Sequence, residues 1–455
     1  MAGLKTLFKA LVALVVSAAF LGFAVCTLRT GPAPSVELLT EAKAIGPRTV
    51  VVARATASGR GLAGLRLELE QKGRVRVVAR RDHRPLPPWR FTREPVAEDE
   101  LRADVGHQAL PELAEGEATV RLVAERASTW LFAPGPMVRE LRLPVRLLPP
   151  FLSVRSTQHY VAQGGSGLVL YRVGETAVTD FVNAGAWRFP GSPLPGGKSG
   201  DRVALFGVPW DLEGALRVVA EDDAGNVASL AFVDRFERRP PARDRIQLDD
   251  AFLTKVVGEI HERTEGVGAR GNLLDDYLAI NRGLRETNAS ELVALAVRSA
   301  PGFLWSEPFL PLRNAKVMSA FADRRSYVYA GREVDQQTHL GFDLAAVART
   351  PVAAPNRGVV RLARYFGIYG NTVVVDHGLG LMSLSAHLSS IEVEEGQSVE
   401  RGEPLGRTGA TGLAGGDHLH FTTLVRGLPV NPIEWWDGKW IRDRVTAKLA
   451  AATPP

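Results

Sequence analysis

Apolar and polar residues alternate along much of the chain between residues 35 and 240. The segments 65–69 and 119–123 have a period of two, which places one set of side chains in a core and the next set in solvent. We therefore predict a mainly β protein whose first folded part is a β-sandwich-like domain over residues 35–148.

A second β domain is predicted over residues 149–240. Its last part, residues 216–228, contains a tight turn at 224–226. This segment resembles the final hairpin of bacterial immunoglobulin-like domains, although a generic hairpin has the same pattern. We interpret both β domains as spacers or as binding surfaces for another cell-envelope protein.

The pattern becomes helical between residues 241 and 300. Pro240 and Pro241 mark a linker, and Asp249 and Asp250 are typical helix-starting residues. Two apolar sets follow at helical spacing: Phe252, Leu253, Val256, Val257 and Ile260, then Leu273, Leu274, Tyr277, Leu278 and Leu284. We predict a short helical linker region over 241–300, and simple packing explains it better than a regulatory lid.

Short apolar runs separated by glycines follow, at residues 372–375, 381–384, 391–393 and 418–424. Such runs are typical of a compact antiparallel sheet. We predict a third folded domain over residues 301–440 and a tail over residues 441–455.

The N-terminus has a different composition. Residues 10–28 form a segment of 19 uncharged, mainly apolar residues, nearly enough for a helix to span a hydrocarbon layer of about 30 Å. Lys5 and Lys9 precede this segment, so the N-terminus is expected in the cytoplasm and everything after Arg29 outside. We predict a cytoplasmic tip and a single transmembrane anchor within residues 1–34.

Two alternatives to an anchor stay open. The Gly-Phe-Ala segment at 22–24 could be the cleavage site of a signal peptide, and Cys26 could carry a lipid, although Val25 is a poor residue before a lipidated cysteine. All three interpretations export the chain. Cys26 is the only cysteine, so no intramolecular disulfide can form, and a metal in the exported part must use His and carboxylate ligands.

The formal net charge of +5 suits an anionic wall or membrane surface but identifies no partner. We see no pattern of basic and aromatic residues that indicates nucleic acid binding, and we expect no nucleic acid partner.

Five of the nine histidines lie between residues 339 and 420. His418 and His420 flank Leu419, so in a strand the two imidazoles point to one face and Leu419 points to the core. His339 and Asp343 would be roughly 13 Å apart in a straight strand, too far for one metal ion. The chain must therefore bend between them, and Gly341 is the residue that permits the bend.

Catalytic zinc typically has three protein ligands and an open position at which water is activated. His339, Asp343 and His420 would provide such a ligand set. His387 and His418 would then be free for acid–base chemistry or for holding an oxyanion. We predict a catalytic Zn²⁺ site with these roles.

The motifs HxxxD, His-Leu and HxH, in this order, resemble the lysostaphin/LytM-type zinc metallopeptidases, which cut peptides of bacterial peptidoglycan. The resemblance covers about residues 315–436, with further matching segments at 319–321, 351–354, 370–378 and 406–412.

The resemblance implies a duplicated hybrid motif fold, zinc ligands at His339, Asp343 and His420, and catalytic assistance from His387 and His418. It also implies a structural role for His377. The chain departs from the family at Ser385, where many relatives have an aromatic residue. If that residue holds the transition state, turnover here would be lower.

We therefore predict a zinc metalloendopeptidase that cuts peptidoglycan cross-links, anchored in a bacterial inner (cytoplasmic) membrane by one helix, with most of the chain exported. The first alternative is a non-hydrolytic regulator that activates another wall hydrolase, but such relatives usually lack zinc ligands. The second alternative is a structural protein that binds the wall, and only the predicted β domains favour this interpretation.

Overall fold

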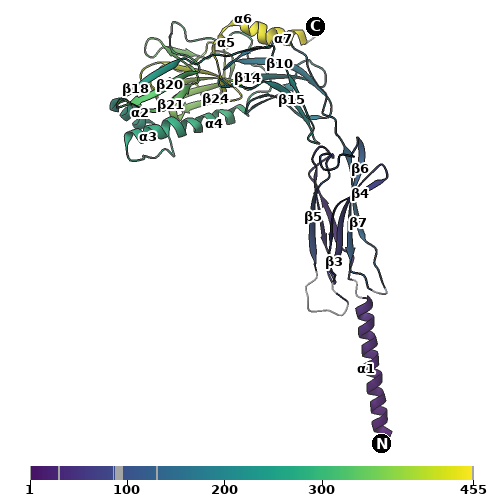
Figure 1. Ribbon diagram of the computed structural model, residues 1–455. Helices are drawn as coiled ribbons and strands as arrows, with labels where there is room; N and C mark the ends of the chain where they lie inside the picture. The colour runs from purple at the N-terminus through teal and green to yellow at the C-terminus, as the bar shows by residue number, and fades with distance from the viewer. Residues whose placement is uncertain (1, 29–30, 86, 88–95, 130–131, 453–455) are drawn as a thin grey trace. The chain divides into compact units, whose positions relative to one another are not determined.

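The computed structural model describes residues 2–28, 31–85, 87, 96–129 and 132–452 (Figure 1). The chain is mainly β, as predicted. It divides into two compact units, one with residues 1–150 and 221–227, the other with residues 151–220 and 228–455. The finer domain boundaries remain predictions.

Helix α1 spans Ala2–Leu28 and therefore begins before the predicted apolar segment. Its apolar part, Gly3–Cys26, contains 24 residues with a mean hydropathy of 2.2. At 1.5 Å per residue this part is about 36 Å long, enough to cross a hydrocarbon layer. Length and composition thus fit a membrane span or a signal sequence. Arg29, which closes the apolar segment, lies outside the described residues.

The N-terminal unit contains two sheets, with strand orders β1-β2-β5 and β4-β3-β6-β7. Leu65, Leu67 and Leu69 of β3 are buried and Arg66 is partly exposed, as the predicted alternation requires, but Glu68 is buried as well. Side chains from both sheets form one hydrophobic core, as in a β-sandwich. The strands are β1 Ser35–Leu39, β2 Val50–Thr56, β3 Leu62–Gln71, β4 Arg74–Asp82, β5 Glu98–Asp104, β6 Gly116–Arg126 and β7 Met137–Val145.

The next β region contains the sheets β13-β14-β10-β8 and β12-β11-β15-β16, and a parallel pair of β17 with β9. The predicted hairpin turn joins β15 to β16, and Gly225 in it has a φ of +82°, which glycine adopts without strain. The strands are β8 Leu152–Val154, β9 Tyr160–Ala162, β10 Ser166–Val173, β11 Ala177–Ala184, β12 Trp187–Pro190, β13 Ser192–Pro193, β14 Asp201–Gly207, β15 Arg217–Asp222, β16 Val227–Ala231 and β17 Arg235–Glu237.

The helical region begins as predicted, because Asp249 caps α2 by accepting a hydrogen bond from the Phe252 backbone N–H at 2.8 Å. The buried face of α2 packs with α3 against strand β20, Asp323–Tyr329 (Figure 1). The second predicted helix is longer and irregular, since a π-helical turn joins α3 to α4. The elements are β18 Arg243–Leu248, α2 Asp250–Arg263, α3 Leu273–Ala279, the π turn Ile280–Leu284 and α4 Arg285–Ala296.

The largest sheet has the order β19-β22-β30-β26-β25-β24-β28, with β31 added to β30, and its paired strands are antiparallel as predicted. Two three-stranded sheets, β18-β20-β21 and β23-β29-β27, lie in the same unit. The strands are β19 Lys316–Ser319, β20 Asp323–Tyr329, β21 Arg332–His339, β22 Phe342–Ala345, β23 Pro351–Ala353, β24 Gly358–Tyr365, β25 Asn371–Gly378, β26 Leu381–Leu388, β27 Ser390–Ile391, β28 Ser398–Val399, β29 Pro404–Arg407, β30 Leu419–Val425 and β31 Leu428–Val430.

The two β regions of the C-terminal unit share one hydrophobic core. Phe206 and Val218 belong to the same buried cluster as Leu381, Val425 and Trp435. These side chains come from segments more than 150 residues apart in the sequence. The two β regions therefore pack around one common hydrophobic core.

The C-terminal segment is helical, and the prediction of a tail over 441–455 missed this. Ile441 and Val445, four residues apart, are buried in the shared core. Residues 453–455 lie outside the described residues. The helices are α5 Ile433–Trp436, α6 Gly438–Ile441, a π turn Arg442–Thr446 and α7 Ala447–Ala452.

A buried carboxylate fixes this segment to β10. Glu434 Oε2 accepts hydrogen bonds from the Ser166 backbone N–H at 2.7 Å and from Ser166 Oγ at 3.0 Å. Burial raises the pKa of Glu434 from 4.5 to about 7, although the hydrogen bonds from Ser166 oppose the shift.

We expect this carboxylate to make folding stability fall as pH rises. Between pH 4.5 and 7 folded Glu434 keeps a proton that the unfolded chain has lost, so the free energy of unfolding decreases across this window by about 3 kcal/mol. Glu434→Gln should lose this component, which urea unfolding at pH 5 and pH 7.5 would measure against the exposed control Glu213→Gln. The same pH dependence in all three proteins would contradict the assignment.

Candidate metal centre

Two neighbouring strands hold a carboxylate opposite an imidazole. Asp343 of β22 and His420 of β30 are directly paired, so their side chains leave the sheet on the same face. Leu419 points into the core on the other face, as predicted. His339 ends β21 and Phe342 begins β22, so the predicted bend is present.

Three candidate ligand atoms lie within reach of one ion. Asp343 Oδ1 is 3.0 Å from His339 Nε2 and 2.9 Å from His420 Nδ1, and the two nitrogens are 3.1 Å apart. The three residues are buried. Ligands at bonds of about 2 Å around a tetrahedral ion are separated by about 3.3 Å, so only small adjustments would be needed.

Hydrogen bonds to the outer ring nitrogens determine which nitrogen faces the centre. His339 Nδ1 lies 2.9 Å from the carbonyl oxygen of Ala320, which can only accept, so Nε2 presents its lone pair. His420 Nε2 lies 3.0 Å from Thr422 Oγ1, whose own proton goes to the Leu340 carbonyl oxygen at 2.9 Å. His420 Nε2 is therefore the donor, and Nδ1 presents its lone pair.

These tautomers direct three acceptors at one point. Two imidazole lone pairs and a carboxylate oxygen cannot satisfy one another, whereas a bound cation would satisfy all three. Two neutral imidazoles and one carboxylate suit a zinc ion that keeps an open position. The residues present therefore fit a divalent metal held by His339, Asp343 and His420.

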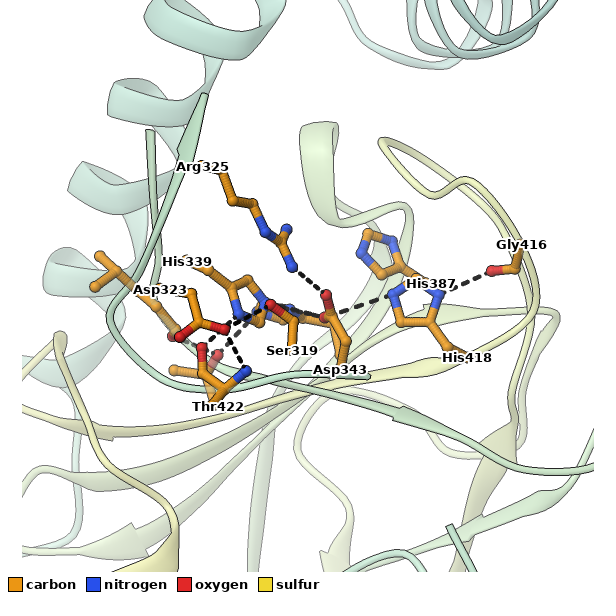
Figure 2. Close-up of polar contacts among 12 residues, drawn as sticks. Ser319, Asp323, Arg325, His339, Asp343, His387, Gly416, His418 and Thr422 are labelled. Carbon is orange, nitrogen blue, oxygen red and sulfur yellow. Dashed lines mark hydrogen bonds and ion pairs between the residues drawn. The ribbon is translucent and has the colours of Figure 1, made fainter. Parts of the chain in front are cut away.

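An arginine holds the outer oxygen of the candidate carboxylate ligand. Arg325 Nη2 donates to Asp343 Oδ2 at 2.6 Å, which leaves Oδ1 for the centre (Figure 2). Burial alone would raise the pKa of Asp343, but the adjacent imidazoles of His339, His418 and His420 lower it well below its usual value. Asp343 is therefore ionised and fixed in orientation.

Gly341 provides space rather than backbone freedom, which corrects the predicted reason for this glycine. Its φ is not positive. A Cβ at this position would lie 2.6 Å from two ring atoms of His420 and from Thr422 Oγ1. Any larger residue would displace the ligand ring or its hydrogen-bond partner.

His387 reaches the metal face through an unusual backbone conformation. Its φ of +60° is a left-handed value that few non-glycine residues adopt, and it interrupts the side-chain alternation of β26. Nδ1 donates to the Thr411 carbonyl oxygen at 2.8 Å, so Nε2 carries the lone pair. The ring centroid lies 4.9 Å from that of His418 and 5.7 Å from that of His420.

His387 and His418 have opposite pKa shifts. Burial, together with the nearby His418 and His420, lowers the pKa of His387 well below its usual value. Burial also opposes protonation of His418, but Asp343, whose Oδ1 lies 3.5 Å from His418 Nε2, raises its pKa overall. Two adjacent imidazoles with different proton affinities are an arrangement that acid–base catalysis can use.

Two other predicted residues lie away from the centre. His377 is fully buried, with Nδ1 2.8 Å from the Arg357 carbonyl oxygen and Nε2 2.9 Å from Ser383 Oγ, as a structural residue would be. Ser385 is paired with Phe421 and lines a separate small cavity with it. An aromatic residue at position 385 would point away from the centre, and the effect of Ser385 on turnover stays a prediction.

The five candidate residues line one cleft of about 460 Å³. The opposite wall includes Phe252 and Tyr277 from the helical region, together with Tyr327 and Tyr369. The helices therefore do more than pack, because they form part of the cleft that contains the centre.

Residues 337–432 match the family model for peptidase family M23. The range contains His339, Asp343, His387, His418 and His420. The chain carries an M23 peptidase domain. The cleft wall contributed by α2 and α3 lies outside the matched range.

The M23 domain is similar in sequence to part of two curated peptidases. The chain is 40% identical over 119 residues to the peptidoglycan DD-endopeptidase ShyA of Vibrio cholerae, covering 26% of this chain and 27% of ShyA. It is 43% identical over 95 residues to the DD-carboxypeptidase/endopeptidase Mpg of Neisseria meningitidis, covering 21% of this chain and 22% of Mpg. The similarity spans about a quarter of the length of these relatives.

Solved structures that match part of the chain include a Pseudomonas aeruginosa protein described as an M23 peptidase, at 23% identity and a TM-score of 0.37, covering 62% of this chain and 96% of that chain. The catalytic domain of lysostaphin from Staphylococcus simulans matches at 24% identity and a TM-score of 0.24, covering 28% of this chain and 94% of that domain.

Sequence patterns missed the residues that orient the ligands. Thr422 follows His420 by two positions, so its place on the same strand face was a usable signal. Arg325 and the carbonyl oxygens of Ala320 and Thr411 had no signal, because they meet the M23 centre only through tertiary pairing.

Removal of the Thr422 hydroxyl should weaken metal binding. In Thr422→Val, His420 Nε2 loses its acceptor, and loss of such an outer hydrogen bond typically weakens metal affinity by about 10–100-fold. Competition with a chromophoric chelator would measure the affinity. The matched control is Thr423→Val, because Thr423 Oγ1 is buried with no hydrogen-bond partner among the described residues. Equal metal affinity in the two variants would exclude this role of Thr422.

Proposed function

We propose that this protein is a zinc-dependent metalloendopeptidase that hydrolyses peptide cross-links of bacterial peptidoglycan. The observation that carries the proposal is the convergence of two imidazole lone pairs and one carboxylate oxygen in the cleft of an M23 domain. Zinc is favoured over magnesium or calcium because imidazole ligands suit zinc, whereas the other two prefer oxygen ligands.

In this proposal three residues bind the metal and two others transfer protons. His339, Asp343 and His420 hold the metal, which when bound polarises a carbonyl group and lowers the pKa of water. His387 accepts a proton at Nε2, because its Nδ1 proton is committed to Thr411. His418 donates its Nδ1 proton to the Gly416 carbonyl oxygen at 2.8 Å, so its Nε2 faces the centre and, when protonated, can donate to the departing amine or to a developing oxyanion.

The name of ShyA supports peptidoglycan as the substrate, since ShyA is named a peptidoglycan DD-endopeptidase, and Mpg is named a DD-carboxypeptidase/endopeptidase. A non-hydrolytic regulator is the less favoured function, because all three candidate ligands and both candidate acid–base residues are present and converge. No observation on the β-sandwich or on the second β region favours a purely structural, wall-binding role.

Digestion of purified peptidoglycan tests the proposal. Full-length protein in detergent should release uncross-linked peptides from sacculi, detected by liquid chromatography and mass spectrometry. A chelator should stop the release and stoichiometric zinc should restore it. Intact cross-links after incubation with the zinc-loaded protein would refute hydrolysis and favour the regulatory alternative.

We further propose that α1 is an uncleaved anchor in a bacterial inner membrane with residues after it exported. Lys5 and Lys9 near the start of the helix favour a cytoplasmic N-terminus. A reporter that fluoresces only in the cytoplasm should be bright when fused before Met1 and dark when fused after Pro455. A bright C-terminal fusion would overturn this topology, and a mature N-terminus near Val25 would replace the anchor by a signal peptide.

A further inference from the structure

The cleft contains two arginines that lie outside the residues matched to family M23. Arg325 is already neutralised, since it pairs with Asp343 at 2.6 Å. Arg285, the first residue of α4, also lines the cleft, and no carboxylate among the described residues pairs with it. The cleft therefore presents one guanidinium that lacks an anionic partner.

Neutral groups hold Arg285 in a fixed orientation. Its Nε donates to the Asn281 carbonyl oxygen at 3.0 Å, and its Nη2 donates to Asn281 Oδ1 at 2.6 Å. Asn281 is fully buried and is itself held by Asp335, because its Nδ2 donates to Asp335 Oδ2 at 2.8 Å. The arginine is thus preorganised without being neutralised, which is the arrangement expected for binding an anion.

The π-helical turn Ile280–Leu284 makes this arrangement possible. It inserts Asn281 between α3 and α4 and directs it to both Arg285 and Asp335. Such turns inside helices occur frequently at functional sites, because they are less favourable than a regular helix and persist where they position a side chain.

Arg285 lies near the metal ligands. It lines the same cleft as His339, Asp343 and His420, together with Tyr277 and Tyr369. The ring of Tyr369 lies 5.7 Å from that of His420, between ring centroids. A peptide whose scissile bond is at the metal centre would therefore bring a neighbouring residue towards Arg285.

We propose that Arg285 binds a free carboxylate on a residue flanking the scissile bond, so that the protein selects cross-links whose amine-donating residue keeps its carboxylate. The guanidinium fork matches a carboxylate in two parallel hydrogen bonds, and within the part of the chain that the structure describes no group accepts a hydrogen bond from Nη1 of Arg285. This inference rests on the proposed function. Cross-links built of glycine or carrying an amide at this position offer no such group.

The test uses two synthetic cross-linked peptides that differ in one group. Both contain a diamino acid whose side-chain amine forms the cross-link, with its α-carboxyl group either free or amidated. Full-length zinc-loaded protein should have a kcat/KM about 10–100-fold higher for the free carboxylate, as expected for a charge-assisted hydrogen bond. Equal rates on the two peptides would overturn the inference while leaving metalloendopeptidase activity intact.

Substitutions assign the preference to this residue. Arg285→Gln should cut both peptides at the lower rate, and Arg285→Lys, which keeps the charge without the fork, should restore part of the preference. The control Arg298→Gln, which removes an exposed positive charge beyond the end of α4, should keep the full preference. A preference that survives in Arg285→Gln would assign carboxylate recognition to another group and overturn the inference.

Equilibrium binding separates this inference from the proposed function. Metal-free protein should bind the free-carboxylate peptide more tightly than the amidated one, by isothermal titration calorimetry, and Arg285→Gln should remove the difference. This result supports carboxylate recognition even if neither peptide is cut, whereas cleavage of both peptides with equal affinity supports the peptidase activity alone.

Discussion

His420→Ala is expected to lose both stoichiometric zinc and all measurable peptidase activity. His420 supplies one of three convergent acceptors, and the other two cannot complete a site for zinc with only one imidazole and one carboxylate. Zinc content after dialysis, measured by mass spectrometry of the metal, and release of peptides from sacculi would show both losses.

A histidine outside the cleft provides the control for this substitution. His261 of α2 is partly buried, and its Nε2 has no hydrogen-bond partner in the described part of the chain. His261→Ala should keep zinc and activity. Full zinc retention in His420→Ala would mean that this histidine is not a ligand, and the candidate ligand set would have to be revised.

Substitutions at His387 and His418 should separate chemistry from metal binding. Each variant should retain zinc but lose about 10²–10⁴-fold in kcat, the usual contribution of a general acid or base. Single-turnover rates together with zinc content would measure the two effects on the same samples.

The backbone of His387 dictates the choice of substituent. Asparagine tolerates a φ of +60° better than alanine, so His387→Asn removes the imidazole with less strain. Alanine is adequate for His418. A variant that proves metal-free would identify its residue as a ligand, and the assigned roles would have to be exchanged.

The order of the histidine and aspartate motifs predicted which residues come together in this centre better than the secondary-structure patterns did. A period of two in 418–420 was enough to place His418 and His420 on one face, because side-chain direction in a strand is a local property. The close approach of Asp343 to His420 depends on cross-strand pairing between β22 and β30, which the sequence alone does not specify. The family resemblance supplied that missing link.

Other features could not be predicted because they depend on tertiary contacts. The left-handed backbone of His387 is unfavourable in isolation and persists only where surrounding structure holds it. The reason for Gly341 was misjudged, since flexibility is visible in a sequence but a ring packed against a glycine is not. The helices after residue 440 were missed because they contain few apolar residues at helical spacing. Those residues become buried only against the shared core, which the sequence does not reveal.

The shared core also bears on inheritance. An M23 domain transferred alone into another protein would expose Leu381, Val425 and Trp435, which are buried together with Phe206 and Val218. Recombination that separated the two β regions would therefore yield an insoluble peptidase. The two β regions of the C-terminal unit, residues 151–220 and 228–455, are therefore expected to be inherited together, whereas the N-terminal sandwich has a core of its own.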